Sequence, residues 1–420
     1  MKGGATLGKE ARDALGGLAT TYVQHRPLWD GVQVPVGVLD AEVLRVGRPG
    51  LIDVVVDTGG RLAHLVVGLR VPGDEAHFLP GSSDAVLGLF EDGEGLAVAV
   101  DAMRDAELAT LLLREVLGEL VEVKHVRPAP SEEGCTALVF DDRFDLRVFE
   151  VLSVAVHPAL ELLLALDEAG FNHLAAPLAI WRRDRTDLGV VQEHLVGATS
   201  GSAVAFTSVR DLYASGGPPE RAGGDFATEA QALGTMTARM HLALDAAFGR
   251  TRLDPRQWAY TIQRRLAEGG GSFAGSDEVL SLLGDLGDVS VPCHAIRVHS
   301  DYHLDRVERV EQGWYLTGFA PVDSASRQQV SPLVDVARML RSFGAVASVG
   351  ASERGPSEER RPQKLMSAWE RRNRRAFISA YRAVPGIAGL VPPRADAFRT
   401  LLSAAEVELA TRDSPQDSFS

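Results

Sequence analysis

The sequence is poor in cysteine, in lysine and in long apolar runs, and each shortage excludes a class of protein. Two cysteines among 420 residues, Cys135 and Cys293, cannot form a disulfide framework, and no CxxC or Cys/His cluster indicates a zinc site. No apolar run approaches the roughly 18 residues that a membrane-spanning helix needs. Residues 1–20 are interrupted by charges and contain no apolar signal core. We therefore expect a reduced, cytoplasmic protein with no membrane partner.

Lysine occurs only at positions 2, 9, 124 and 364, so arginine supplies almost all of the positive charge. The formal net charge is −14. A nucleic-acid-binding protein needs a basic face for the phosphates, so this balance argues against a nucleic-acid partner. At 420 residues the chain exceeds what one hydrophobic core usually supports, and two or three packed units are expected.

The first part of the chain, residues 1–100, reads as a β-rich N-terminal cap. Residues 32–39, 51–57 and 62–71 are rich in Val and Leu and are bounded by Gly, Pro and Asp, which is typical of short strands joined by turns. Residues 101–121 then carry leucines at helical spacing, which predicts a helix.

An intermediate mixed β/α lobe is expected over residues 101–196. Residues 136–140 and 144–151 predict a hairpin across an Asp-Asp-Arg turn. Residues 159–169 predict a helix that starts at Pro158. Further strands are expected over 174–182 and 189–196.

Residues 197–420 read as a helical lobe that is interrupted by a loop with short strands around 297–320. Periodic apolar residues predict helices over the following ranges: 226–248, 254–267, 277–286, 332–343, 364–384 and 394–412.

Three stretches resemble the maltokinases, bacterial relatives of the aminoglycoside phosphotransferases. They are residues 208–213 (SVRDLY, followed by GGDFA at 223–227), residues 297–304 (RVHSDYHL) and residues 331–343 (SPLVDVARMLRSF). The resemblance implies an α+β, two-lobed, protein-kinase-like fold. It also implies an ATP-dependent sugar kinase that phosphorylates maltose and that uses magnesium.

The resemblance assigns roles to residues that this chain keeps. Asp301 matches the catalytic aspartate, and His299 and His303 belong to the loop around it. Glu161 matches the helix glutamate that pairs with a phosphate-binding lysine. Asp335 matches an aspartate that braces the catalytic loop, so its role would be structural.

Other family positions have changed. The phosphate-binding lysine is replaced by Arg147, whose planar fork is not interchangeable with an ammonium group. The magnesium-binding amide that lies five residues after the aspartate is replaced by Arg306, which would repel the ion. The second magnesium ligand falls in residues 318–320 (GFA), which contain no carboxylate. No metal is therefore expected at this site, and binding of ATP and magnesium is in doubt.

Three readings of this pattern remain open. The first is a pseudokinase that acts as a partner or regulator near trehalose and α-glucan metabolism, because the missing groups stabilise the transition state directly. Trehalose synthase or another α-glucan enzyme is then the expected partner. The second is an active, divergent sugar kinase that uses Asp301 as base, Asp305 and Asp323 as substitute metal ligands, and Arg147 and Arg306 as phosphate clamps. The third is a scaffold protein whose β-rich cap recruits another enzyme.

Overall fold

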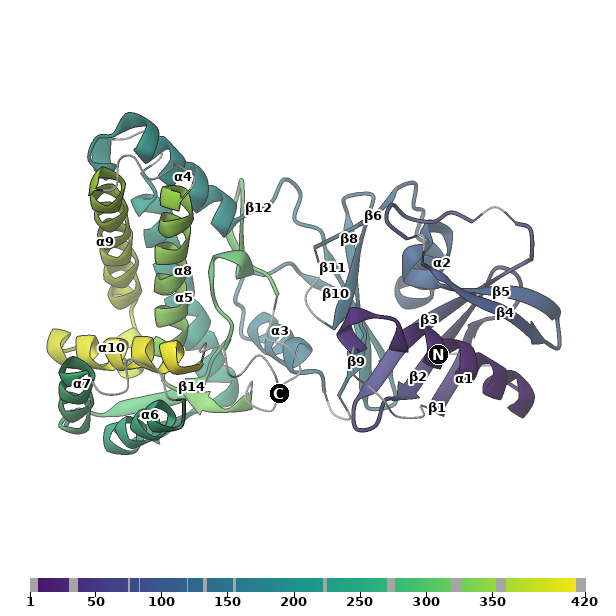
Figure 1. The fold of residues 1–420 in the computed structure, drawn as a ribbon, viewed down its shortest axis with the longest axis horizontal. Coiled ribbons are helices and arrows are strands. Elements are labelled where there is room, and N and C mark those ends of the chain that lie inside the picture. The colour runs from purple at the N-terminus through teal and green to yellow at the C-terminus, as the bar shows by residue number, and fades with distance from the viewer. Residues whose placement is uncertain are drawn as a thin grey trace. The chain divides into compact units, whose positions relative to one another are not determined.

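A computed structural model describes residues 7–29, 37–74, 76–82, 84–118, 120–130, 134–153, 156–221, 225–269, 276–318, 327–352 and 360–412. The chain folds into two compact units. The first comprises residues 1–161 and 175–196, and the second comprises residues 162–174 and 197–420. Figure 1 shows strands dominating the first unit and helices dominating the second. None of the helices in the described ranges is both long and apolar enough to cross a bilayer.

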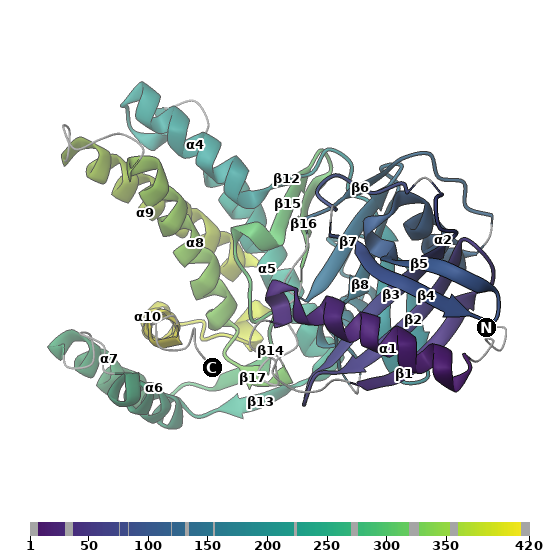
Figure 2. The same cartoon turned by 45° about the vertical axis from the view of Figure 1, so that its right-hand side comes forward.

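The cap portion of the first unit is a helix packed on an antiparallel sheet. The sheet has the order β1-β2-β3-β5-β4, and the short strand β9 (Val151–Leu152) pairs with β3. The elements are α1 (Lys9–Gln24), β1 (Gly37–Arg45), β2 (Gly50–Asp57), β3 (Leu62–Arg70), β4 (Val86–Asp92) and β5 (Gly95–Asp101). Figure 2 shows α1 lying across these strands.

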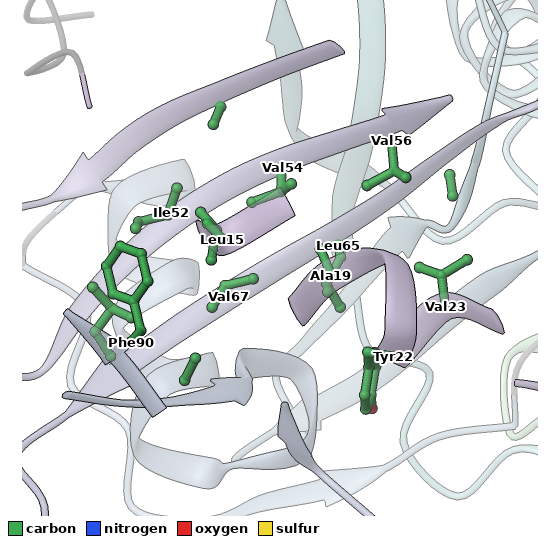
Figure 3. Packing of buried hydrophobic residues seen from close by; sticks show 14 of the residues in the cluster. Leu15, Ala19, Tyr22, Val23, Ile52, Val54, Val56, Leu65, Val67 and Phe90 are labelled. Atoms are coloured by element: carbon green, nitrogen blue, oxygen red, sulfur yellow. The ribbon is translucent and has the colours of Figure 1, made fainter. Parts of the chain in front are cut away.

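The core of this portion forms because α1 is apolar on one face only. Leu15, Ala19 and Tyr22 are buried on that face at a helical spacing. They point toward alternate residues of β2 and β3, such as Val54 and Val67, whose side chains share one face of the sheet (Figure 3). Burial of these apolar side chains stabilises the helix, which contains two adjacent glycines and two adjacent threonines.

A second antiparallel sheet completes the first unit. Its order is β10-β11-β8-β7-β6. The elements are α2 (Ala106–Leu117), β6 (Val126–Pro128), β7 (Cys135–Phe140), β8 (Phe144–Phe149), α3 (Pro158–Glu168, which continues into the second unit), β10 (Pro177–Arg183) and β11 (Thr186–Glu193). The two sheets are joined by buried charge, because Arg183 of β10 lies 2.8 Å from the fully buried Asp53 of β2.

The second unit is mainly helical. Its helices are α4 (Gly201–Ser215), α5 (Ala227–Phe248), α6 (Pro255–Gly269), α7 (Asp277–Gly287), α8 (Leu333–Ser352), α9 (Arg360–Ala383) and α10 (Ala395–Arg412). Two small sheets accompany them: β12 (Thr199–Ser200) with β15 (Val307–Val310) and β16 (Gly313–Leu316), and β13 (Arg250–Leu253) with β14 (Cys293–Arg297) and β17 (Gln329–Val330).

Helices α5 and α9 approach closely at a glycine. A Cβ atom on Gly234 of α5 would lie 2.3 Å from the carbonyl oxygen of Phe377 in α9, so only glycine permits this contact. Around it, Trp369 of α9 donates a hydrogen bond from its indole nitrogen to Ser208 of α4 at 3.0 Å. The motif at 208–213 is therefore a packing surface of the helical unit.

The structure confirms most of the predicted elements and corrects others. The expected strands at 51–57 and 62–71 and the hairpin at 136–151 are present as β2, β3 and β7–β8. The expectation of strands alone in the first hundred residues is wrong, because residues 9–24 form α1, and β4 and β5 were not predicted. The helix expected over 101–121 is shorter, because β5 ends at Asp101 and Asp105 caps the helix by accepting hydrogen bonds from two backbone amides.

Candidate functional site

The candidate site is the loop of the second unit that connects β14 to β15. It contains the short 3₁₀ turn η4 (Leu304–Arg306). Ser300 adopts a positive φ of 72°, a left-handed conformation that strains a residue with a Cβ atom. Such a backbone needs support from its surroundings, and the start of α8 supplies it.

Asp335 of α8 provides this support. Its side chain is fully buried, and its two carboxylate oxygens accept hydrogen bonds from the backbone amides of His299 at 2.8 Å and Ser300 at 3.0 Å. His241 of α5 contacts the same carboxylate at 3.3 Å through Nε2, and its Nδ1 lies 2.9 Å from the hydroxyl of Tyr381. A buried charge that is hydrogen-bonded on several sides holds a loop in one conformation.

His299 is a structural member of the loop. Its Nε2 lies 2.8 Å from the carbonyl oxygen of Gly318, to which it can only donate, and its Nδ1 lies 3.4 Å from the amide of Asp301. Burial lowers the pKa of His299 although Asp335 lies nearby. A neutral imidazole that carries its proton on Nε2 satisfies both contacts.

Asp301 is held by an arginine. Nη2 and Nε of Arg306 lie 2.6 Å and 2.9 Å from the same carboxylate oxygen, Oδ2. The other oxygen lies 3.6 Å from Nε2 of His303 and 3.8 Å from Nη1 of Arg338. Partial burial raises the pKa of Asp301, but the neighbouring His303 and Arg306 outweigh burial and hold the pKa well below its ordinary value. The carboxylate is ionised, paired and poorly basic.

The donor set around Asp301 does not fit a divalent cation. A hard cation needs several oxygen ligands, and here a guanidinium occupies one oxygen of the carboxylate. Asp305 is exposed and lies 3.8 Å from Nδ1 of His303. Within the described ranges no three His, Cys, Asp or Glu residues are placed to hold a metal ion. Asp323 and residues 319–320, where the resemblance places the second magnesium ligand, lie outside those ranges.

The two remaining predicted residues lie in the first unit. Arg147 is half-buried on β8, where it is paired in register with Val190 of β11 and Ala137 of β7. Glu161 lies in the first turn of α3. Their place in a nucleotide site stays a prediction.

Arg338, His241 and Tyr381 contribute to the site, although the sequence analysis gave them no role. Arg338 lies one helical turn after Asp335, a spacing that places both on one side of α8 and that could have revealed it. His241 and Tyr381 lie far away in the sequence, and only tertiary packing brings them to Asp335.

The β-rich unit, the helical unit and the braced loop together have the fold of a kinase. The structure superimposes on a solved glucosamine kinase in complex with glucosamine, ADP and inorganic phosphate, with a TM-score of 0.64 and 20% identity over 96% of this chain and 93% of that chain. A second crystal form of glucosamine kinase gives a TM-score of 0.63 at 21% identity, over 96% of this chain and 92% of that chain. The expected two-lobed α+β kinase fold is thereby confirmed.

The sequence comparison points the same way. The chain is 29% identical to a glucosamine kinase of Streptacidiphilus jiangxiensis over 246 residues. The match spans about half of each protein, 54% of this chain and 54% of the relative. No family model matches the sequence. The relatives named above are glucosamine kinases, so the finer resemblance to maltokinases stays a prediction.

Proposed function

We propose that this chain is a maltokinase-like pseudokinase, a protein that keeps the sugar-kinase scaffold but does not transfer phosphate. The observation that carries the proposal is the contact between Arg306 and Asp301, in which two guanidinium nitrogens lie 2.6 Å and 2.9 Å from one carboxylate oxygen. A base for phosphoryl transfer must accept a hydrogen bond from the acceptor hydroxyl. Here Arg306 donates hydrogen bonds to Asp301 in place of such a hydroxyl.

The electrostatics of the loop support the same proposal. The lowered pKa of Asp301 makes it a weak proton acceptor, and the neighbouring His299 is buried and engaged by Gly318. The reaction also needs positive charge that neutralises the phosphoryl group during its transfer. In this fold a metal ion provides that charge. Arg306 stands at the position of a family ligand for that ion.

The proposed role is that of a partner or regulator near trehalose and α-glucan metabolism, with trehalose synthase or another α-glucan enzyme as the partner. The support for this role is the resemblance of residues 208–213 and 331–343 to maltokinases. Co-purification of the full chain with such an enzyme, compared with a chain that lacks the cap, would test both the partner and the part that binds it.

The test of the pseudokinase is a calorimetric titration of the full chain with ATP, with and without magnesium. We expect either no binding or binding that magnesium does not strengthen. ATP binding that magnesium strengthens clearly would overturn the proposal, because it would require a metal site that the paired Asp301 does not provide.

A second candidate is an active sugar kinase, which the 29% identity to a glucosamine kinase and the intact brace on the Asp301 loop favour. A coupled assay with glucosamine and maltose as acceptors separates the two candidates. Turnover by the wild type that disappears in Asp301→Asn would establish the kinase. Absence of turnover with both sugars would favour the pseudokinase.

A further inference from the structure

A groove on the helical unit lies away from the Asp301 loop. It forms where the end of α9 meets the 3₁₀ turn η7 (Ile387–Gly389) and residues 391–393, which precede α10, and its volume is about 590 Å³. Figure 1 shows α9 and α10 within this unit. The floor is apolar and is built from Ile378, Ile387, Val391 and Pro392, of which Ile387 and Val391 are almost fully buried.

Two arginines line this groove. Arg375 is exposed and Arg382 lies two turns further along α9. Within the described part of the chain, neither has a carboxylate within ion-pair distance, unlike Arg372 and Arg374 on the same helix, which pair with acidic residues. The groove therefore combines an apolar floor with positive charge that no carboxylate of the described residues neutralises.

Arg382 is already fixed in place. Its Nη2 donates a hydrogen bond to the carbonyl oxygen of Pro393 at 2.7 Å, and its guanidinium lies 4.8 Å from the ring centre of Phe398. Neither contact removes its charge. A pre-ordered guanidinium binds a carboxylate at a lower entropic cost than a free side chain does.

The distribution of charge along the chain makes this surface distinctive. Residues 1–196 contain 17 basic and 31 acidic residues, whereas residues 197–420 contain 26 of each. Within the second part, α9 alone carries eight basic residues against one acidic residue. An acidic partner is therefore attracted to α9 and repelled by the first 196 residues.

We infer that this groove is a docking site for an acidic segment of another protein, in which carboxylates meet Arg375 and Arg382 and an aliphatic side chain fills the apolar floor. Helix faces and grooves commonly bind peptides in this way, with apolar anchors for affinity and charges for orientation. This inference does not depend on whether the Asp301 loop is active.

The test uses the full chain and three fluorescein-labelled peptides. The first is Glu-Glu-Glu-Leu repeated three times, the second replaces Glu by Lys, and the third replaces Leu by Ser. Fluorescence anisotropy should show saturable, salt-sensitive binding of the first peptide, weaker binding of the third and none of the second. Arg375→Glu should weaken binding of the first peptide about tenfold, because it reverses a charge at the contact.

Matched variants keep the result interpretable. Arg210→Glu reverses an exposed charge on α4, away from the groove, and should leave binding unchanged. Ile378→Ser should weaken binding through the floor without a change of charge. Circular dichroism of each variant would confirm that the helical unit is folded.

Three results would overturn the inference: no binding of the acidic peptide, equal binding of the lysine peptide, or equal losses in Arg375→Glu and Arg210→Glu. Self-association in sedimentation velocity that Arg375→Glu abolishes would also overturn it, in favour of a second copy of this chain as the occupant.

Discussion

At the scale of single residues, position 306 decides the chemistry of the loop. The groups that hold the loop in shape are present. Asp335 accepts hydrogen bonds from the backbone amides of His299 and Ser300, and His241 and His299 each have a hydrogen-bond partner. An arginine at position 306 nevertheless places a cation 2.6 Å from the carboxylate of Asp301, the residue that was predicted to act as the base. The loop therefore keeps the contacts that hold its shape, while the carboxylate of Asp301 is paired with a cation.

Arg306→Ala should raise the pKa of Asp301 toward its ordinary value of about 3.9. The folded pKa is lowered, so the pair stabilises the protein fully above that ordinary value and less as the pH falls through the folded pKa. We expect the variant to lose about 1–2 kcal/mol of unfolding free energy at pH 7, and we expect the difference to shrink as the pH falls below about 4.

Carboxyl-carbon NMR would follow Asp301, and urea denaturation at several pH values would follow stability. The matched control is Arg394→Ala, which removes a fully exposed pair with Asp396 and should change stability little. An unchanged titration of Asp301 in Arg306→Ala would contradict the assigned cause.

Asp335→Asn should destabilise the helical unit. An amide has only one acceptor oxygen, so one of the two loop amides would face an NH₂ group in a fully buried site. We expect a loss of about 2–4 kcal/mol in urea denaturation. Asp305→Asn, an exposed change in the same loop, should cost almost nothing. Equal losses in the two variants would show that Asp335 does not brace the loop.

At the scale of elements, the contact between α5 and α9 depends on a missing side chain. Gly234 lets the backbones approach, and its place in the middle of a 22-residue helix is otherwise unfavourable. The intrinsic cost of glycine in a helix is about 1 kcal/mol. The free energy gained by packing the two helices closely must exceed this cost. A Cβ atom at position 234 would meet the backbone of Phe377, which cannot move aside as the end of a side chain can.

Gly234→Ala should therefore lower stability by about 1–3 kcal/mol, because overpacking outweighs the gain in helix propensity. Gly284→Ala on α7 is the matched control. No atom lies within 4 Å of its added Cβ, so the change should be neutral or stabilising. Thermal denaturation of both variants would check the pair. If the Gly234→Ala variant were more stable than the wild type, α5 and α9 would have room to move apart.

At the scale of the whole molecule, the chain consists of two units, each with its own buried residues. The core of the cap in the first unit is built from α1 and the sheet β1–β5, and α1 contributes Leu15, which is fully buried (Figure 3). Cores that are separate in space can lose stability separately.

Leu15→Ala should destabilise the first unit by about 2–4 kcal/mol, because it leaves a cavity under α1. Hydrogen exchange should show faster exchange in α1, β2 and β3, with α5 and α9 unchanged. Leu280→Ala, at a half-exposed position on α7, serves as the control. Equal loss of protection in both units would show that they unfold together.

Much of the fold was predictable because local patterns and tertiary packing agree. Periodic leucines predicted a helix over 101–121, within which residues 106–117 are helical, and apolar runs between turn residues predicted β2 and β3. Where the local preference for helix or strand is weak, tertiary packing decided the secondary structure. Gly16 and Gly17 obscure α1, which is helical because its apolar face is buried on the sheet. Gly88 interrupts strand β4, which pairs with β5, and β5 in turn depends on pairing with the earlier strand β3.

The site divides in the same way. The sequence by itself predicted that Asp301 lies in a kinase-like loop that Asp335 braces, and that arginines stand at positions 147 and 306 where the resemblance implies a lysine and an amide. It left open whether Arg306 would clamp a phosphate or close the site. Only the tertiary structure decided that its guanidinium lies on Asp301, because the direction of a long side chain depends on the backbone turn and on neighbouring charges, which sequence spacing does not contain.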